Sequence, residues 1–109
     1  LTDVTEDMPV FKEETFGPLA AIIKVKDRDE AIATAANSRL GLGSMLFTED
    51  VDAAMAIISK IPDGAFFIND MVKSDPRLPF GGTKASGYGR ELSRGILEFV
   101  NKKTVYIKK

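Results

Sequence analysis

The chain has 109 residues, of which 44% are hydrophobic and 28% are charged, and its 15 basic and 16 acidic residues give a net charge of −1. These values are typical of one globular domain of ordinary size. An even mixture of charges argues against a nucleic-acid-binding face or a membrane-surface patch. The longest unbroken apolar run, Ala53–Ile58, is far too short to span a membrane. We therefore expect neither a nucleic acid nor a membrane as a partner.

The chain contains no cysteine, no histidine and no tryptophan. Without cysteine there can be no disulfide and no thiolate metal ligand, and without histidine the commonest metal ligand is missing. The usual nucleophile–base pairs of covalent catalysis cannot be assembled from these residues alone. We expect no metal site, and the absence of cysteine is consistent with a cytoplasmic protein.

In the first part of the chain, Met8–Phe11 fits a short strand or a loop, and the largely apolar run Leu19–Val25 is typical of a strand that is covered on both faces. Asp27 and Glu30 have the spacing of a capping box. Apolar residues then recur at helical spacing over Ala31–Ala36, which predicts a helix.

Two more strands and a second helix are predicted in the middle of the chain. Ser44–Phe47 and Ala65–Ile68 are apolar and predict strands. Between them, the acidic start Thr48–Asp50 predicts a helix whose apolar face reaches Ile61. The following segment, Asn69–Pro79, predicts a loop.

The last part of the chain predicts a helix and a final strand. Leu92, Ile96, Leu97 and Val100 share one helical face, and Thr104–Ile107 alternates as a strand does. Strands and helices therefore alternate along the chain, which predicts the α/β fold class, with helices layered on a mainly parallel sheet.

The glycine-rich loop, Leu78–Glu91, holds four of the nine glycines. Such a density indicates sharp turns or close backbone contacts, so this loop is expected to be a site wall or a packing element. It does not match a phosphate loop, because Tyr88-Gly89 stands where Lys-Ser/Thr should follow Gly87. Gly41-Leu42-Gly43 does not match a dinucleotide fingerprint, because it follows a predicted helix.

Acidic residues near each end of the chain could serve a site. Glu13 and Glu14 stand beside Phe16, and a carboxylate with an aromatic ring could contact a sugar and a base; the alternative is a solvated acidic turn. Glu91 could be a buried acid or a proton relay; the alternative is an acid at a helix start, stabilised by the helix dipole.

The loop between the third strand and the glycine-rich loop carries Lys73, Ser74 and Arg77. Two cations and a hydroxyl could bind a substrate carboxylate. An ordinary surface loop would have the same composition, and the residues alone leave both explanations open.

Three blocks, in matching order and spacing, resemble the C-terminal portion of the aldehyde dehydrogenase superfamily. They are EETFGP at residues 13–18, GAFFIN at 64–69 and PFGGTKASGYGRE at 79–91, with Leu40-Gly41-Leu42 before the second strand. The resemblance covers essentially the whole chain. Residues 71–78, MVKSDPRL, are most similar to the branch that oxidises succinate semialdehyde.

This resemblance implies a fold and a division of the chain. The fold would be a three-layer α/β structure with a mainly parallel sheet, and residues 1–103 would be part of the catalytic domain. Residues 104–109 would form a strand that joins the sheet of a neighbouring subunit. Self-association through Thr104–Lys109 would be a form of strand addition.

The resemblance also implies a role for several residues. Glu14 matches the acid that holds the nicotinamide-ribose hydroxyls, and Phe16 matches the aromatic residue beside the nicotinamide. Ser74 matches a serine near the substrate carboxylate, and Lys73 and Arg77 lie in the same loop. The cofactor of an intact enzyme would be NAD or NADP, and its substrate a small aldehyde.

Glu91 matches an acid that some members of the family place in a water relay behind the active site. The segment from Glu91 to Gly95 is one residue shorter than the family spacing. Because a one-residue deletion turns the rest of a helix by about 100°, either the start of the helix is rebuilt or the chain lacks a residue there.

The family's nucleophilic cysteine, general-base glutamate, oxyanion-hole asparagine and dinucleotide-binding fold all lie upstream of the matching region. We therefore expect these 109 residues alone to be inactive and to bind no cofactor. The alternative is a non-enzymatic, free-standing α/β module for assembly or binding, which would pair through Thr104–Lys109. The presence of a cysteine nucleophile encoded before Leu1 would distinguish the two.

Overall fold

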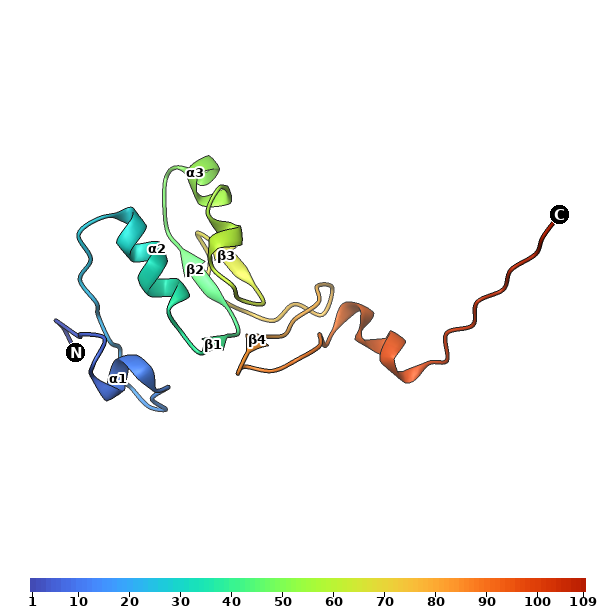
Figure 1. The fold of residues 1–109 in the computed structure, drawn as a ribbon, viewed down its shortest axis with the longest axis horizontal. Coiled ribbons are helices and arrows are strands. Elements are labelled where there is room, and N and C mark those ends of the chain that lie inside the picture. Colours follow the sequence, from blue (N-terminus) through green and yellow to red (C-terminus); the bar gives the residue numbers. More distant parts are fainter.

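The helix α2, Arg28–Ala36, begins at the capping residues that the sequence predicts. The computed structural model describes residues 1–109 (Figure 1). Asp27 Oδ1 accepts a hydrogen bond from the backbone N–H of Glu30 at 2.9 Å, and Glu30 Oε2 accepts one from Lys26 N at 2.7 Å. The two side chains thus satisfy donors that have no partner inside the helix.

The second predicted helix is present as two shorter pieces. α3, Val51–Met55, begins after Asp50, whose Oδ1 accepts a hydrogen bond from Ala53 N at 2.9 Å. A 3₁₀ helix, η1, follows at Ile58–Lys60. The expectation of one continuous helix was wrong, because α-helical hydrogen bonding ends after Ala56. Ala56 N still bonds to Asp52 O, four residues back, but Ile57 N bonds to Ala54 O, three residues back.

The parallel pairing of two predicted strands is confirmed. β2, Ser44–Leu46, pairs in parallel with β3, Phe66–Ile68, and Met45 lies opposite Phe67. The connection between them contains α3 and η1, so the segment is a β-α-β unit, as parallel neighbours require.

Asn69 ends this unit and begins the loop that follows. Its backbone has a φ of 57°, in the left-handed region that asparagine tolerates better than most residues. Its side-chain amide accepts a hydrogen bond from Thr48 N and donates one to Thr48 O, both at 2.8 Å. The side chain therefore continues the strand pairing by one more residue and fixes where the loop starts.

A second pair of strands was not predicted. β1, Leu40–Gly41, pairs antiparallel with β4, Thr83–Lys84, so the glycine-rich loop lies against the end of α2. Each strand has only two residues, and they are far apart in the sequence. No hydrophobic pattern of useful length could reveal such a pair.

Two expectations for the first 25 residues were wrong. Met8–Phe11 is mostly helical, because α1 spans Pro9–Lys12 with its proline at the start, where a helix needs no N–H. Leu19–Val25 forms no strand. It only exchanges three hydrogen bonds with residues 1–4, and Ile22 is 58% exposed, so this run is not covered on both faces.

The predicted helix after the glycine-rich loop is a 3₁₀ helix, η2, at Ser93–Phe99. Leu92 and Ser93, just before and at its start, have φ values of 61° and 39°, which are rare for such side chains. The chain therefore enters η2 through two left-handed residues, and both explanations of the short spacing after Glu91 stay predictions. The apolar face stays uncovered, since Ile96 is 68% exposed.

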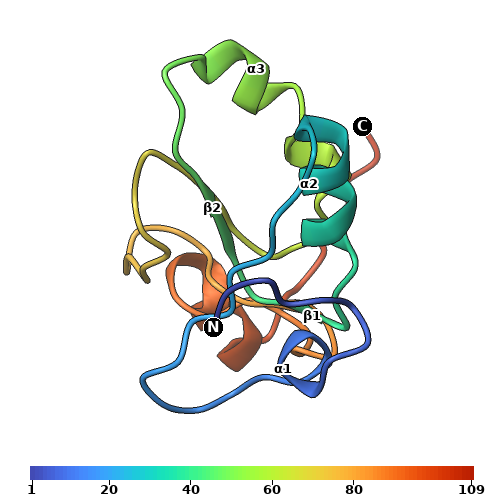
Figure 2. The ribbon, with the colours of Figure 1, turned by 90° about the vertical axis from the view of Figure 1, so that its left-hand side faces the viewer.

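The expected final strand is not formed within this chain. Residues 100–109 contain no helix or strand, and they run away from the rest of the molecule (Figure 1). Viewed from the left-hand side of Figure 1, α2 and α3 lie toward the top and α1 toward the bottom, with β2 between them (Figure 2). The two sheets have two strands each, so the three-layer sheet expected for the fold is not present in these residues.

The chain buries little of its own surface. The apolar side chains with less than a tenth of their area exposed are Val4, Ala54 and Ile57. The accessible surface is 8970 Å², whereas a compact chain of this mass exposes about 6,000 Å². The radius of gyration is 18.1 Å, against about 13 Å for a compact domain of this length. This arrangement lacks a core of its own.

We expect the 109-residue chain, expressed alone, to unfold without a cooperative transition in urea and to bind the dye ANS in the absence of denaturant. Three buried apolar side chains cannot balance the conformational entropy of ordering the chain. Circular dichroism and ANS fluorescence would measure this. A sharp, protein-concentration-independent transition would contradict it.

Candidate functional site

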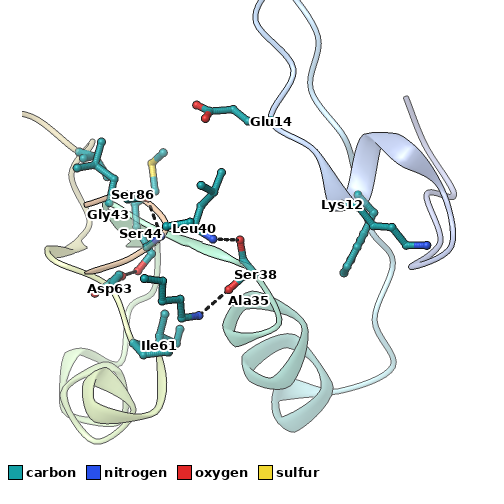
Figure 3. Close-up of a pocket in the computed structure, with 18 of the residues that line it drawn as sticks. Lys12, Glu14, Ala35, Ser38, Leu40, Gly43, Ser44, Ile61, Asp63 and Ser86 are labelled. Carbon is teal, nitrogen blue, oxygen red and sulfur yellow. Dashed lines mark hydrogen bonds between the residues drawn. The ribbon is translucent and has the colours of Figure 1, made fainter. Parts of the chain in front are cut away.

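The largest cavity, which we call the first cavity, has a volume of about 820 Å³. It lies between the segment Phe11–Glu14 and the backbone of Leu40–Ser44, and Lys84 and Ser86 of the glycine-rich loop also line it. Figure 3 shows the Glu14 side chain extending from the N-terminal segment toward the other lining residues. Glu14 thus reaches a space large enough for part of a nucleotide.

Phe16, the other residue assigned to a cofactor, does not line the first cavity. Its side chain is 91% exposed, two residues beyond Glu14. Gly17, which follows it, has a φ of 144°, so the chain turns here in a conformation that suits glycine. Nothing within these residues covers the ring.

Lys84 fastens the glycine-rich loop to α2. Its ammonium donates hydrogen bonds to the carbonyl oxygens of Ala36 at 3.0 Å and Ser38 at 2.7 Å. Ala36 is the last residue of α2 and Ser38 lies two residues beyond it, so a cation at this position interacts favourably with the negative end of the helix dipole. Lys84 itself has a φ of 53°, so the loop turns sharply to bring the side chain there.

Two hydroxyls of the glycine-rich loop complete this attachment. Ser86 Oγ accepts a hydrogen bond from Gly41 N at 2.9 Å, and Thr83 Oγ1 donates one to Pro62 O at 2.8 Å. At Gly64 the backbone of Gly81 is so close that a Cβ would overlap its carbonyl oxygen. The loop is therefore a packing element and wall of the first cavity, in agreement with its failure to match a phosphate loop.

The polar loop after β3 turns at Asp75. Leu78 N donates to Asp75 O at 2.9 Å, and Pro76 occupies the second position of the turn, where its fixed φ fits. Asp75 Oδ1 accepts hydrogen bonds from Arg77 N and Arg77 Nε, both at 2.9 Å, and Oδ2 accepts one from an Arg77 terminal nitrogen at 2.6 Å. The Asp-Pro-Arg order thus builds the turn and a two-pronged ion pair together.

Both cations assigned to substrate binding are therefore paired within their own loop. Lys73 Nζ lies 2.5 Å from Asp70 Oδ2, and Arg77 lies 2.6 Å from Asp75. Ser74, the third residue of this group, is exposed. The sequence identified the cations but not the two acids that hold them.

These contacts lower the pKa of both acids. The Arg77 hydrogen bonds hold the pKa of Asp75 below its usual value of 3.8, and the Lys73 ammonium does the same for the pKa of Asp70. Because both pKa values are lowered on pairing, the pairing is fully formed above the usual value and is lost as the pH falls through the lowered one. Both ion pairs are thus intact at neutral pH.

A small third cavity, of about 350 Å³, lies beside this loop. The ring-bearing residues Phe66, Phe67 and Phe80 line it together with Lys73 and Asp75. Ser74 and Arg77 do not line it. A largely apolar hollow that is also lined by a cation and an anion has the composition of a small-molecule subsite.

Glu91 lies in a different place again. Its backbone forms an isolated bridge with Phe80, with N to O distances of 2.8 and 3.0 Å, and this bridge closes the glycine-rich loop. The side chain is exposed and lines a second cavity of about 770 Å³, between the loop and η2. Glu91 is thus exposed within these residues, and its role stays a prediction.

The structure therefore places three of the assigned residues at three separate cavities, whereas Phe16, Ser74 and Arg77 line none of these. Glu14 lines the first, Glu91 the second and Lys73 the third. No cavity formed by this chain alone brings the assigned cofactor, relay and substrate residues together. The residues between them must be supplied from elsewhere if they form one site.

Sequence reasoning missed Asp70, Asp75 and Lys84. The first two had a local signal, since Asp70 is three residues from Lys73 and Asp75 begins an Asp-Pro turn. Lys84 had none, because its partners are 46 and 48 residues away in the sequence. No three or more acidic side chains gather where they could hold a metal ion. No helix of the chain combines the length and apolar character needed to cross a membrane.

Comparison with known proteins identifies relatives of the whole chain. A profile described as "Aldehyde dehydrogenase family" matches residues 1–105. A "Probable succinate-semialdehyde dehydrogenase" (NADP(+)) from Synechocystis is 52% identical over 108 residues, which are 98% of this chain and 24% of that protein. A succinate-semialdehyde dehydrogenase (NADP(+)) from Deinococcus radiodurans is 49% identical over 106 residues, 96% of this chain and 22% of that protein.

Solved structures give the same relationship in three dimensions. The succinic semialdehyde dehydrogenase from Streptococcus pyogenes, in complex with NADP+, matches with a TM-score of 0.92 at 45% identity, over 99% of this chain and 24% of that one. A Mycobacterium tuberculosis aldehyde dehydrogenase complexed with NAD+ matches with a TM-score of 0.88 at 39% identity, over 98% and 22%. The chain thus spans about a quarter of the length of these relatives.

The attachment made by Lys84 can be tested in a chimera in which this chain replaces the matching quarter of the Synechocystis relative. We expect Lys84→Met to lower the free energy of unfolding by about 1–2 kcal/mol, because two carbonyls lose a charged donor. Urea unfolding would measure it. Lys60→Met, at an exposed lysine that ends η1, is the matched control. Equal effects of the two substitutions would contradict the prediction.

Proposed function

We propose the function of this chain from its family. The chain belongs to the aldehyde dehydrogenase family. The chain would be the C-terminal part of an NAD(P)-dependent aldehyde dehydrogenase that oxidises succinate semialdehyde to its carboxylic acid. The observation that carries this proposal is the 52% identity to a probable succinate-semialdehyde dehydrogenase over 98% of the chain. The solved relatives named above were determined with NADP+ or NAD+, which supports either cofactor.

The chemistry that makes and breaks bonds would belong to the remainder of such an enzyme. In this family a cysteine thiolate adds to the aldehyde carbon, and the adduct becomes a thioester only when a hydride leaves that carbon; this chain has no cysteine. The nicotinamide cofactor supplies the acceptor of the hydride. The present residues would bind and orient, and without the remainder we expect no oxidation of aldehydes and no cofactor binding.

Glu14 fits a role in holding the cofactor. It is exposed and lines the first cavity, which is open and about 820 Å³ in volume. A carboxylate can accept hydrogen bonds from two ribose hydroxyls at once. Phe16 would pack on the nicotinamide ring, and its 91% exposure leaves the ring free for such a contact.

The polar loop would hold the other end of the substrate. Ser74 would donate its hydroxyl to the substrate carboxylate, and Lys73 and Arg77 would supply positive charge. Lys73 is the member of this group that lines the third cavity. Glu91 would take part in a water relay only if other parts of the enzyme cover its exposed side chain.

The uncovered surfaces of the chain would be interfaces in the complete protein. Residues 1–103 would belong to the catalytic domain, whose other strands would extend the β2–β3 sheet into a three-layer structure. Residues 104–109 would add a strand to a neighbouring subunit, which fits the exposure of Val105, Tyr106 and Ile107. The cytoplasmic location of the enzyme stays a prediction.

A free-standing module for assembly or binding is the second candidate. The same exposed final segment favours it, because an unpaired apolar strand can pair with another chain. Such a module would function without cysteine chemistry, and its partner would bind at Thr104–Lys109.

The intact mass of the natural gene product, measured from its own cells, separates the two proposals. The enzyme proposal expects a mass several times 11.9 kDa and oxidation of succinate semialdehyde by that product with NAD or NADP. A mass near 11.9 kDa, or a larger protein that oxidises no aldehyde, would overturn the enzyme proposal. The first of these results would favour the free-standing module.

The role of Glu14 can be tested in the full-length protein with Glu14→Gln. We expect the KM for the cofactor to rise roughly tenfold, because an ionised acceptor of two hydroxyls becomes neutral, while the KM for the aldehyde changes little. Steady-state kinetics at saturating concentrations of the second substrate would measure both. The matched control is Glu13→Gln, since Glu13 is the neighbouring acid and also lines the first cavity. An unchanged cofactor KM would contradict the role.

A further inference from the structure

The polar loop after β3 carries no net charge, because each of its cations has an acidic partner. Lys73 pairs with Asp70 and Arg77 with Asp75. Long-range attraction of an anion needs a surplus of positive charge. In the proposed function, this loop binds the substrate carboxylate. While both ion pairs are intact, however, the loop has no surplus of positive charge to attract that carboxylate.

The two pairs differ in how firmly they are built. Both side chains of the Lys73–Asp70 pair are half exposed or more, at 60% and 50%, and one contact joins them. In the other pair Asp75 is 25% exposed, and it also holds the backbone N–H of Arg77 and carries the turn to Leu78. Asp75 is thus fixed by the fold, while Lys73 is free to move.

The contacts of Asp75 with Arg77 resemble those that a substrate carboxylate would make. Nε and a terminal nitrogen of the guanidinium reach the two oxygens of one carboxylate, at 2.9 and 2.6 Å. This is the two-pronged geometry by which arginine recognises carboxylates in general. Asp75 therefore occupies the Nε edge of Arg77, one of the two edges at which a guanidinium can bind a carboxylate in this way.

We propose that Asp75 is a specificity-determining residue, which acts as an internal carboxylate in competition with the substrate's carboxylate for Arg77. The inference rests on the proposed function and concerns the same site. A carboxylate-bearing aldehyde that binds the same edge must exchange places with Asp75, and at the other edge it meets a guanidinium whose charge Asp75 already balances. In both cases Asp75 weakens its binding. An uncharged aldehyde makes no such exchange, and Asp75 does not affect it.

Asp75→Asn in the full-length protein tests the competition. Asparagine keeps the shape of the side chain and the oxygen that accepts from the Arg77 backbone, but it removes the charge. We expect kcat/KM for succinate semialdehyde to rise about two- to fivefold relative to kcat/KM for butanal, the size of an exposed ion pair. The change should come from KM, since Asp75 is not among the reacting groups.

Two further variants control the experiment. Asp29→Asn removes the same charge from another exposed pair, in which Asp29 lies 3.8 Å from Arg28, and it should leave the ratio of the two aldehydes unchanged. In an Arg77→Gln background, Asp75→Asn should no longer change the ratio, because the guanidinium for which the two carboxylates compete is absent. A shift of the ratio in that background equal to the shift in the native background would overturn the proposal.

Calorimetric titration with succinate keeps this test separate from the enzyme activity. Asp75→Asn should tighten succinate binding to the full-length protein by the same two- to fivefold. If the protein oxidises neither aldehyde, the proposed function fails, and the succinate titration still decides the competition. Equal succinate affinity of the native protein and the variant, or an equal loss of kcat for both aldehydes, would overturn it.

Discussion

The attachment of the glycine-rich loop to the end of α2 holds the chain together. Lys84 donates to two carbonyls at the end of the helix, the loop hydroxyls reach Gly41 and Pro62, and Gly64 admits the backbone of Gly81. These contacts join residues that are 17 or more positions apart in the sequence (Gly64 and Gly81 are the nearest), in a chain whose buried apolar side chains number only three. With so small a core, backbone and charged hydrogen bonds determine where β1, β4 and the walls of the first cavity lie.

The small amount of buried apolar surface also explains why the candidate site is open. The chain exposes about half as much surface again as a compact chain of its mass. Glu14, Lys73 and Glu91 each face an open cavity that has walls on only part of its circumference. The match to the aldehyde dehydrogenase family over residues 1–105 explains why these cavities are open. The relatives are about four times as long, and this segment makes up about one quarter of their length. The surfaces that are open here are where the remainder of such a protein would pack.

Charge pairing in the polar loop links local sequence to substrate choice. Asp-Pro-Arg forms a turn, and the same aspartate that starts the turn binds the arginine side chain. A residue needed for the backbone conformation thereby controls how much positive charge the loop offers to a ligand. Two cations in a loop therefore do not by themselves form an anion site. Whether they can bind an anion depends on the acidic residues with which they pair.

The sequence by itself determined the elements with local signals. The cap of α2 follows from Asp27 and Glu30, β2 and β3 from their apolar runs, and family membership from three motifs in order, because each depends on neighbouring residues. Only the tertiary structure decided what depends on distant residues. The β1–β4 pair, the Lys84 attachment and the exposure of Leu19–Val25 required the position of segments far apart in the chain. An apolar run becomes a covered strand only when other elements supply the cover, and these 109 residues do not supply it.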